Sequence, residues 1–168
     1  EVVATIERAA AAVEAANQDA SEGAVALRGQ AWSQLGIAYE ANTMWSLAEP
    51  CYAQAFALLP DKPEWLYRQG VCLHAAGELD KALEVFRSAS DQLTNTAVVQ
   101  ARHGDTALTL GLVDEAGKAW ERAIASEAQL GGEIRFAESR VGLAQVRVEQ
   151  ERWEEAQILL REALELNP

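Results

Sequence analysis

The 168-residue chain carries a net charge of −12, with 49% hydrophobic and 24% charged residues. This composition excludes a disordered chain, and the acidity disfavours a nucleic-acid partner because phosphate would be repelled. No run is long and apolar enough to span a bilayer, so we expect no membrane insertion and a soluble protein of the cytoplasm or the periplasm.

The first predicted element is an alanine-rich helix over residues 2–17, with its apolar side chains on one face. A polar, turn-forming run follows up to Gly23. In this run Asp19 or Ser21 is available to cap the next helix.

Two helical segments are predicted between residues 32 and 60, joined by a break at 41–43. In each segment large side chains recur at spacings of three and four, which gives each helix one apolar stripe. Ser46 and Glu49 have the spacing of a capping box, which predicts that the second helix begins at Leu47.

Small and aromatic residues of this stretch recur twice at a fixed interval of 34 in the numbering. Gly77, between the two helices of the second copy, can take the left-handed conformation that ends a helix. In a fourth copy the interval is 40, and the six added residues are most economically placed around 130–135. The recurring residues are Gly36, Ala48, Tyr52 and Ala55, then Gly70, Ala82, Phe86 and Ala89, then Gly104, Ala116, Trp120 and Ala123, and finally Ala144, Ala156, Leu160 and Ala163.

The first copy reads Trp32, Leu35, Gly36 and Tyr39, followed by alanine, an aromatic residue and proline, which resembles one unit of the tetratricopeptide repeat. The resemblance implies an all-α fold, a right-handed α-solenoid of antiparallel helix pairs in a superhelix. The alanine-rich, acidic composition is also bacterial-looking. The implied organisation is a single domain over 1–168, with an N-terminal helix or half repeat at 2–17, repeats at 29–62, 63–96 and 97–130, and a lengthened fourth repeat at 131–168.

No catalytic motif is present in the sequence. His74 and His103 stand outside any motif, the carboxylates are expected on solvated helix faces, and no spacing fits a metal or phosphate site. We therefore expect no enzymatic activity, no catalytic residue, no cofactor and no metal. Cys51 and Cys72 are expected as small core residues on neighbouring helices, so that a disulfide between them is allowed by position but disfavoured.

The resemblance further implies that regularly spaced positions of each repeat's first helix line a concave, peptide-binding groove. Arg68 and Arg102 stand at equivalent positions of adjacent repeats, so together they could hold a carboxylate. Alternatively, they pair with the chain's own Glu64, Asp105 or Glu138. The peptide-groove candidates are Ser33, Ile37, Glu40, Tyr67, Arg68, Val71, His74, Arg102, Asp105, Leu108, Val141 and Gln145.

Members of the family that bind chaperone tails hold a peptide C-terminus with a Lys, Asn, Asn, Lys, Arg clamp. Only the last of the five positions agrees, so we predict against chaperone-tail binding of that type. The matching positions here are Ser33, Ile37, Arg68, Val98 and Arg102.

These features indicate a non-catalytic protein–protein interaction scaffold that binds a partner peptide or protein in its concave groove. Trp65 and Tyr67 are either an anchor for that partner or packing residues against the neighbouring repeat. The alternative function is a structural assembly or spacer module cut from a longer protein, self-associating through its ends. A homo-oligomer would then form through the uncapped C-terminal repeat, where Ile158 and Leu164 contribute apolar surface.

Overall fold

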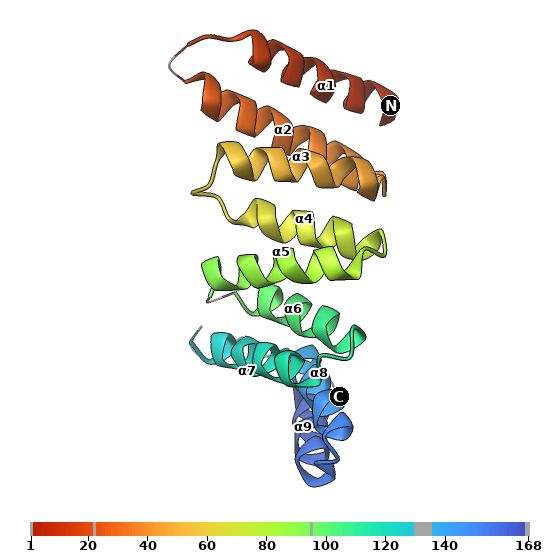
Figure 1. Cartoon of the computed structure of the whole chain (residues 1–168). Coiled ribbons are helices and arrows are strands. Elements are labelled where there is room, and N and C mark those ends of the chain that lie inside the picture. Colours follow the sequence, from red (N-terminus) through yellow and green to blue (C-terminus); the bar gives the residue numbers. More distant parts are fainter. Residues whose placement is uncertain (1, 22, 95, 130–135, 167–168) are drawn as a thin grey trace. The chain divides into compact units, whose positions relative to one another are not determined.

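The computed structural model describes residues 2–21, 23–94, 96–129 and 136–166, and within these ranges its regular elements are all α-helices (Figure 1). The six added residues expected around 130–135 lie outside the described residues. The helices are α1 (Val2–Gln18), α2 (Ala24–Glu40), α3 (Trp45–Leu58), α4 (Glu64–Ala75), α5 (Leu79–Gln92), α6 (Ala97–Thr109), α7 (Val113–Gln129), α8 (Ala137–Glu149) and α9 (Trp153–Leu166).

The helices form two compact units, Glu1–Val85 and Phe86–Pro168, with the boundary inside α5. In the first unit α1 packs on α2, α2 on α3, and α3 on α4. In the second unit α6 packs on α7, α7 on α8, and α8 on α9. Each unit is therefore built by contacts between helices that follow one another along the chain, the arrangement from which repeat arrays gain their stability.

Four turn residues between paired helices share a left-handed backbone. The φ angles are 57° at Thr43, 81° at Gly77, 75° at Gly111 and 59° at Glu151. Their numbers differ by 34, 34 and 40, the intervals of the sequence repeat. The predicted conformation of Gly77 is confirmed, and the structure adds two residues with side chains in the same strained region.

A glycine facing an aromatic ring is the packing contact that recurs with the period. A Cβ on Gly36 would lie 2.8 Å from Cε1 of Tyr52, and a Cβ on Gly104 would lie 2.8 Å from Cδ1 of Trp120. Both members of the second pair have numbers larger by 68, which is twice 34. Gly142 of α8 closes on the same Trp120 ring. Glycine is required because any side chain there would collide with a buried ring.

Tyr52 is the centre of a buried cluster in the first unit, with Cys72 beside it and Trp65 packed against it. The Trp65 and Tyr52 rings are stacked, with centroids 6.0 Å apart and planes inclined by 7°. Trp65 thus packs against the preceding helix pair, in agreement with its interpretation as a packing residue against the neighbouring repeat. Cys51 and Cys72 are both buried free thiols, so no disulfide joins them.

Two predicted helix caps are wrong. Helix α3 begins at Trp45, two residues before Leu47, and its N-cap is Met44 without a side-chain hydrogen bond. The backbone carbonyl of Met44 already accepts the N–H groups of Leu47 and Ala48, both at 3.0 Å, so the first turn closes before Ser46. Glu49, the expected partner in the capping box, instead accepts a hydrogen bond from Gln69 Nε2 at 2.7 Å.

The cap predicted for α2 is the second error. The N-cap is Gly23, again without a side-chain hydrogen bond. Asp19 Oδ1 accepts the backbone N–H of Ser21 at 2.8 Å, so the two candidates stabilise the turn between α1 and α2 and leave the helix end to Gly23.

Candidate functional site

The first unit contains a broad hollow, called hollow A here, between α1, α2 and the start of α4. Its volume is 670 Å³. Its α1 wall consists mainly of alanines, α2 contributes side-chain amides, and Trp65 and Lys62 close it at α4. The lining residues are Ala12, Ala15, Ala16, Asp19, Leu27, Gln30, Ala31, Ser33, Gln34, Lys62 and Trp65.

The second unit contains a smaller hollow, called hollow B, between α6, α7 and the start of α8. Its volume is 280 Å³. Val98 and Phe136 are largely exposed apolar residues at its edge, and the buried Trp120 forms part of its wall. The lining residues are Ala97, Val98, Ala101, Arg102, Asp105, Trp120, Phe136, Glu138 and Ser139.

The two hollows occupy the same place in the repeat. Residues 30, 33 and 34 of hollow A become 98, 101 and 102 of hollow B when 68, twice the period of 34, is added. Residues 62 and 65 become 136 and 139 when 74 is added, which is one period of 34 plus the longer interval of 40. The fold thus forms a hollow between the first helices of successive repeats in each unit, and substitutions change its chemistry.

The chemistry of the two hollows differs strongly. Hollow A presents the amides of Gln30 and Gln34 and the ammonium of Lys62, groups suited to hydrogen bonds with a peptide backbone or a carboxylate. Hollow B has Val98 and Phe136 at two of the equivalent places, so it is suited to an apolar side chain.

Three of the groove residues expected from the sequence line a hollow. Ser33 lies in the wall of hollow A, where it is buried and donates from Oγ to the carbonyl of Gln30 at 2.8 Å. Arg102, which is exposed, and Asp105 line hollow B. The other candidates lie outside both hollows, namely Ile37, Glu40, Tyr67, Arg68, Val71, His74, Leu108, Val141 and Gln145.

Arg68 is engaged by an acid of its own chain. Its Nη1 lies 2.8 Å from Glu40 Oε2, and its guanidinium lies 6.0 Å from the centroid of the Tyr52 ring. Glu40 also accepts a hydrogen bond from the Tyr52 hydroxyl. Burial, together with this bond to a carboxylate, raises the pKa of Tyr52 well above its usual value, so the hydroxyl stays a donor. Arg68 thus pairs with an acid of its own chain, which was the alternative to holding a partner's carboxylate. The acid is Glu40 and not one of the three that the sequence suggested.

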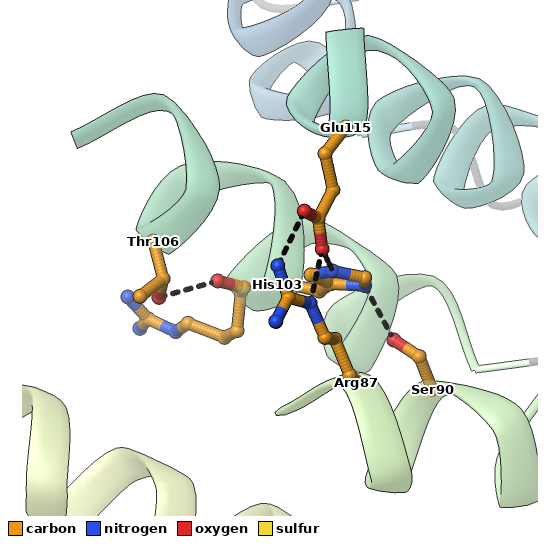
Figure 2. A network of polar contacts seen from close by, with 6 residues as sticks. Arg87, Ser90, His103, Thr106 and Glu115 are labelled. Atoms are coloured by element: carbon orange, nitrogen blue, oxygen red, sulfur yellow. Dashed lines mark hydrogen bonds and ion pairs between the residues drawn. The ribbon is translucent and has the colours of Figure 1, made fainter. Parts of the chain in front are cut away.

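A second polar network lies in the second unit, around the buried His103 (Figure 2). Its Nε2 lies 2.7 Å from Glu115 Oε1, and its Nδ1 lies 3.1 Å from Ser90 Oγ. Arg87 forms two bonds to the Glu115 carboxylate, at 2.6 and 2.7 Å. The Arg87 bond is the main cause that lowers the pKa of Glu115 to about 2, and the His103 bond adds to it.

Serine, histidine and glutamate in a hydrogen-bonded row resemble a nucleophile, base and orienting acid. Ser90, however, is only 1% exposed, so a substrate has no access to its hydroxyl. The network therefore joins α5, α6 and α7 as a structural element. Sequence reasoning missed it because its members are 13 and 12 residues apart, on three helices.

Among the described residues, no group of three or more His, Cys, Asp or Glu side chains is placed to hold a metal ion. In the same part of the chain, no helix combines the length and the apolar character needed to cross a bilayer.

Comparison with known structures shows the fold. MamA is 18% identical, with 86% of each chain covered and a TM-score of 0.74. YrrB, described as a tetratricopeptide repeat protein with an unusual peptide-binding site, is 18% identical over 99% of this chain and 81% of its own, with a TM-score of 0.73. The tetratricopeptide domain of Sgt2 from Aspergillus fumigatus is 23% identical over 73% of this chain and 79% of its own, with a TM-score of 0.64.

Comparison of sequences shows the family. No curated protein matches the chain as a relative. The profile of the tetratricopeptide repeat, however, matches residues 33–94 and 102–168, which is well over half of the chain. The predicted all-α solenoid of helix pairs is thereby confirmed, and this protein belongs to the tetratricopeptide repeat family.

Proposed function

We propose that this repeat protein acts as a non-catalytic scaffold by holding a peptide segment of a partner protein along the first helices of its repeats. The observation that carries the proposal is the recurrence of a hollow at the same repeat position in both units. Recognition of successive peptide side chains requires pockets at a regular spacing whose chemistry differs from one to the next. The helix packing maintains such a hollow in each unit, and substitutions vary the side chains that line it.

Hollow B is proposed as the pocket for an apolar anchor. Its 280 Å³ is slightly below the range of about 300–1,000 Å³ that whole small-molecule ligands occupy, so it suits one large side chain. Trp120, Val98 and Phe136 supply the apolar contact, and the exposed Arg102 can take a carboxylate next to the anchor. Hot spots of interfaces are pockets of this kind, aromatic in their walls and charged at their rims.

Hollow A is proposed to hold the backbone of the same kind of peptide. Gln30 and Gln34 provide both donors and acceptors, which an extended backbone needs on each side. Arg68 is left out of this proposal as a direct clamp, because its guanidinium already pairs with Glu40.

The test begins with a phage-displayed peptide library selected against the immobilised full chain, followed by calorimetry with the selected peptides. Val98→Glu places a carboxylate in hollow B and is expected to weaken binding about tenfold or more. Arg102→Glu is expected to weaken peptides that carry an acidic residue and to leave neutral ones within about twofold.

The matched control is Val25→Glu, because Val25 and Val98 are both 51% exposed valines on first helices, and Val25 lies outside both hollows. Its affinity should stay within about twofold of the original protein. Equal affinities for the Val98→Glu variant and the original protein, with the fold intact by circular dichroism, would exclude hollow B as the binding pocket.

A further inference from the structure

Two charged side chains are buried between α7 and α8. Glu127 of α7 is 0% exposed and Arg140 of α8 is 5% exposed. Nη1 of Arg140 donates a hydrogen bond to Oε2 of Glu127 and another, at 3.2 Å, to the backbone carbonyl of Phe136. Phe136 is the N-cap residue of α8. The ion pair therefore connects α7 to the point at which α8 begins.

The first unit has leucines at the equivalent places. Position 127 corresponds to Leu59 when 68 is subtracted, and position 140 corresponds to Leu66 when 74 is subtracted. Leu66 is 7% exposed, so this place is buried in both units. Helix α4 packs on α3 with these leucines, which means that the fold can fill both places with apolar side chains.

The ion pair contributes little to stability in comparison with such leucines. Glu127 Oε1 and Arg140 Nε have no hydrogen-bond partner among the described residues, and Glu162 Oε2 of α9 lies 3.9 Å from that Nε. Burial removes both charges from water, and an incompletely hydrogen-bonded pair does not fully offset that cost. Stability alone therefore does not explain why the second unit carries charges here.

The hydrogen bonds of the pair differ from apolar contacts because they are directional. A guanidinium donates along fixed directions in its plane, whereas hydrophobic contact is non-directional. The carbonyl that Arg140 holds belongs to Phe136. The α8 wall of hollow B consists of Phe136, Glu138 and Ser139. The pair thus acts on the segment that closes hollow B.

We infer that Glu127 and Arg140 are positioning residues for hollow B, which hold its α8 wall against α7 in the place that the apolar anchor of a partner peptide requires. The inference deepens the proposed function and rests on it, because hollow B is the proposed pocket for that anchor. Neither residue lines the hollow, so both act through Phe136 and its neighbours. The pair contributes more to the affinity for the anchor than to the stability of the fold.

The test replaces the pair by the leucines of the first unit. Glu127→Leu with Arg140→Leu keeps the net charge and fills the space with apolar side chains, so the denaturant midpoint is expected to stay equal or to rise. The peptides are those library peptides that lose binding to the Val98→Glu variant. Their affinity is expected to fall about tenfold, because the wall is no longer held in place. A merely structural role predicts instead that affinity and stability fall together.

A second ion pair between the same helices supplies the matched control. Nη2 of Arg147 in α8 lies 2.5 Å from Oε1 of Glu121 in α7, and neither residue lines hollow B. The variant Arg147→Leu with Glu121→Ala installs the equivalent residues of the first unit, Leu73 and Ala53. It also removes one charge of each sign from this interface, and its peptide affinity should stay within about twofold of the original protein.

Amide hydrogen exchange of the peptide-free protein gives a readout that depends on no ligand. The backbone N–H of Arg140 is the first in α8 that can bond within the helix, so residues 140–143 report how often the start of α8 opens. Exchange there is expected to be about fivefold faster in the double leucine variant and unchanged in the control. If no library peptide needs hollow B, the proposed pocket fails, and this measurement alone still decides the positioning role.

Glu127→Gln is a further variant that keeps the shape of the side chain and one acceptor oxygen. A neutral amide accepts a weaker bond from Arg140, so the same peptides are expected to bind about threefold more weakly, with faster exchange at 140–143.

Three results would overturn the inference. The first is exchange at 140–143 that neither variant changes. The second is an equal loss of peptide affinity in the control, because the docking of α8 as a whole would then shape the hollow. The third is a denaturant midpoint that falls in step with the affinity in both variants, because the pair would then be merely structural.

Discussion

At the scale of single residues, the turn positions show how the repeat constrains the sequence. Two of the four left-handed turn positions are the glycines Gly77 and Gly111, whereas the other two, Thr43 and Glu151, carry side chains. A residue with a side chain in this backbone region lowers the stability of the folded state by roughly 1–2 kcal/mol relative to an ordinary conformation. Threonine is also branched at Cβ, which adds steric crowding. The turn geometry is therefore imposed by the packing of the helix pair on either side.

Replacing Thr43→Gly is expected to raise the free energy of unfolding by about 0.5–1 kcal/mol, because relief of strain exceeds the added entropy of the unfolded chain. Gly77→Ala should lower it by about 1 kcal/mol for the same reason. Urea unfolding followed by circular dichroism measures both. A shift of the same sign in both variants would show that backbone strain is not the cause.

The Glu115 carboxylate predicts a response to acid. Its folded pKa is lowered from 4.5 to about 2, chiefly by Arg87, so its contribution to stability is complete above the ordinary value and is lost as the pH falls toward 2. Glu115→Gln is expected to be less stable at pH 7, with the gap to the original protein closing between pH 5 and pH 2. Denaturant midpoints across this range check it.

Glu84→Gln, at an exposed position of α5, is the control for that series. It should leave the midpoints within about 0.5 kcal/mol of the original protein at every pH. A gap that stays constant from pH 7 to pH 2 for Glu115→Gln would contradict the ion pair with Arg87 as its source.

At the scale of elements, most of the helical pattern could be predicted from the sequence, because helix periodicity is local. The break at 41–43 and the turn at Gly77 follow from side-chain spacing and glycine alone. The start of α3 was missed because the Met44 carbonyl, and no side chain, closes its first turn. A backbone cap of this kind leaves no signature in the residue types.

The interior of α3 contains Pro50, its sixth residue. The ring removes the hydrogen bond to the Ser46 carbonyl and crowds that turn. Pro50→Ala is expected to raise the free energy of unfolding by about 1–2 kcal/mol, after the gain of unfolded-state entropy is subtracted. Urea unfolding measures the change.

Gln54→Ala, at an exposed position of the same helix, is the matched control and should change stability by less than about 0.5 kcal/mol. Equal stabilities for Pro50→Ala and the original protein would mean that α3 already accommodates the ring without losing helical stability.

The candidate site could be predicted only in part, for physical reasons. Repeat spacing put Arg102 and Asp105 among the groove candidates, and the structure shows that both line hollow B. The pairing of Arg68 with Glu40 could not be predicted, because a long flexible side chain selects among several acids within reach, and the choice depends on the distance between helices. The two hollows can be recognised as equivalent only when the last interval is taken as 40. Phe136 then corresponds to position 62, which lies one interval of 34 and one of 40 earlier.

At the scale of the whole molecule, each of the two units is stabilised internally by the same kind of contact. Neighbouring helices supply the packing in each, so stability is distributed among many small interfaces. The net charge of −12 acts on the whole chain and repels like partners, while salt screens it beyond about 10 Å at 0.1 M.

The distribution of the two buried thiols has a practical consequence. Cys51 and Cys72 both belong to the first unit, and the chain has no other cysteine. Burial raises their pKa values to about 11 and about 12, so the reactive thiolate is scarce at neutral pH. An alkylating reagent then reaches Cys51 only while α3 is apart from α1 and α2, and it reaches Cys72 only while α4 is apart from α3. The rate of alkylation therefore measures how often the first unit opens around these two residues.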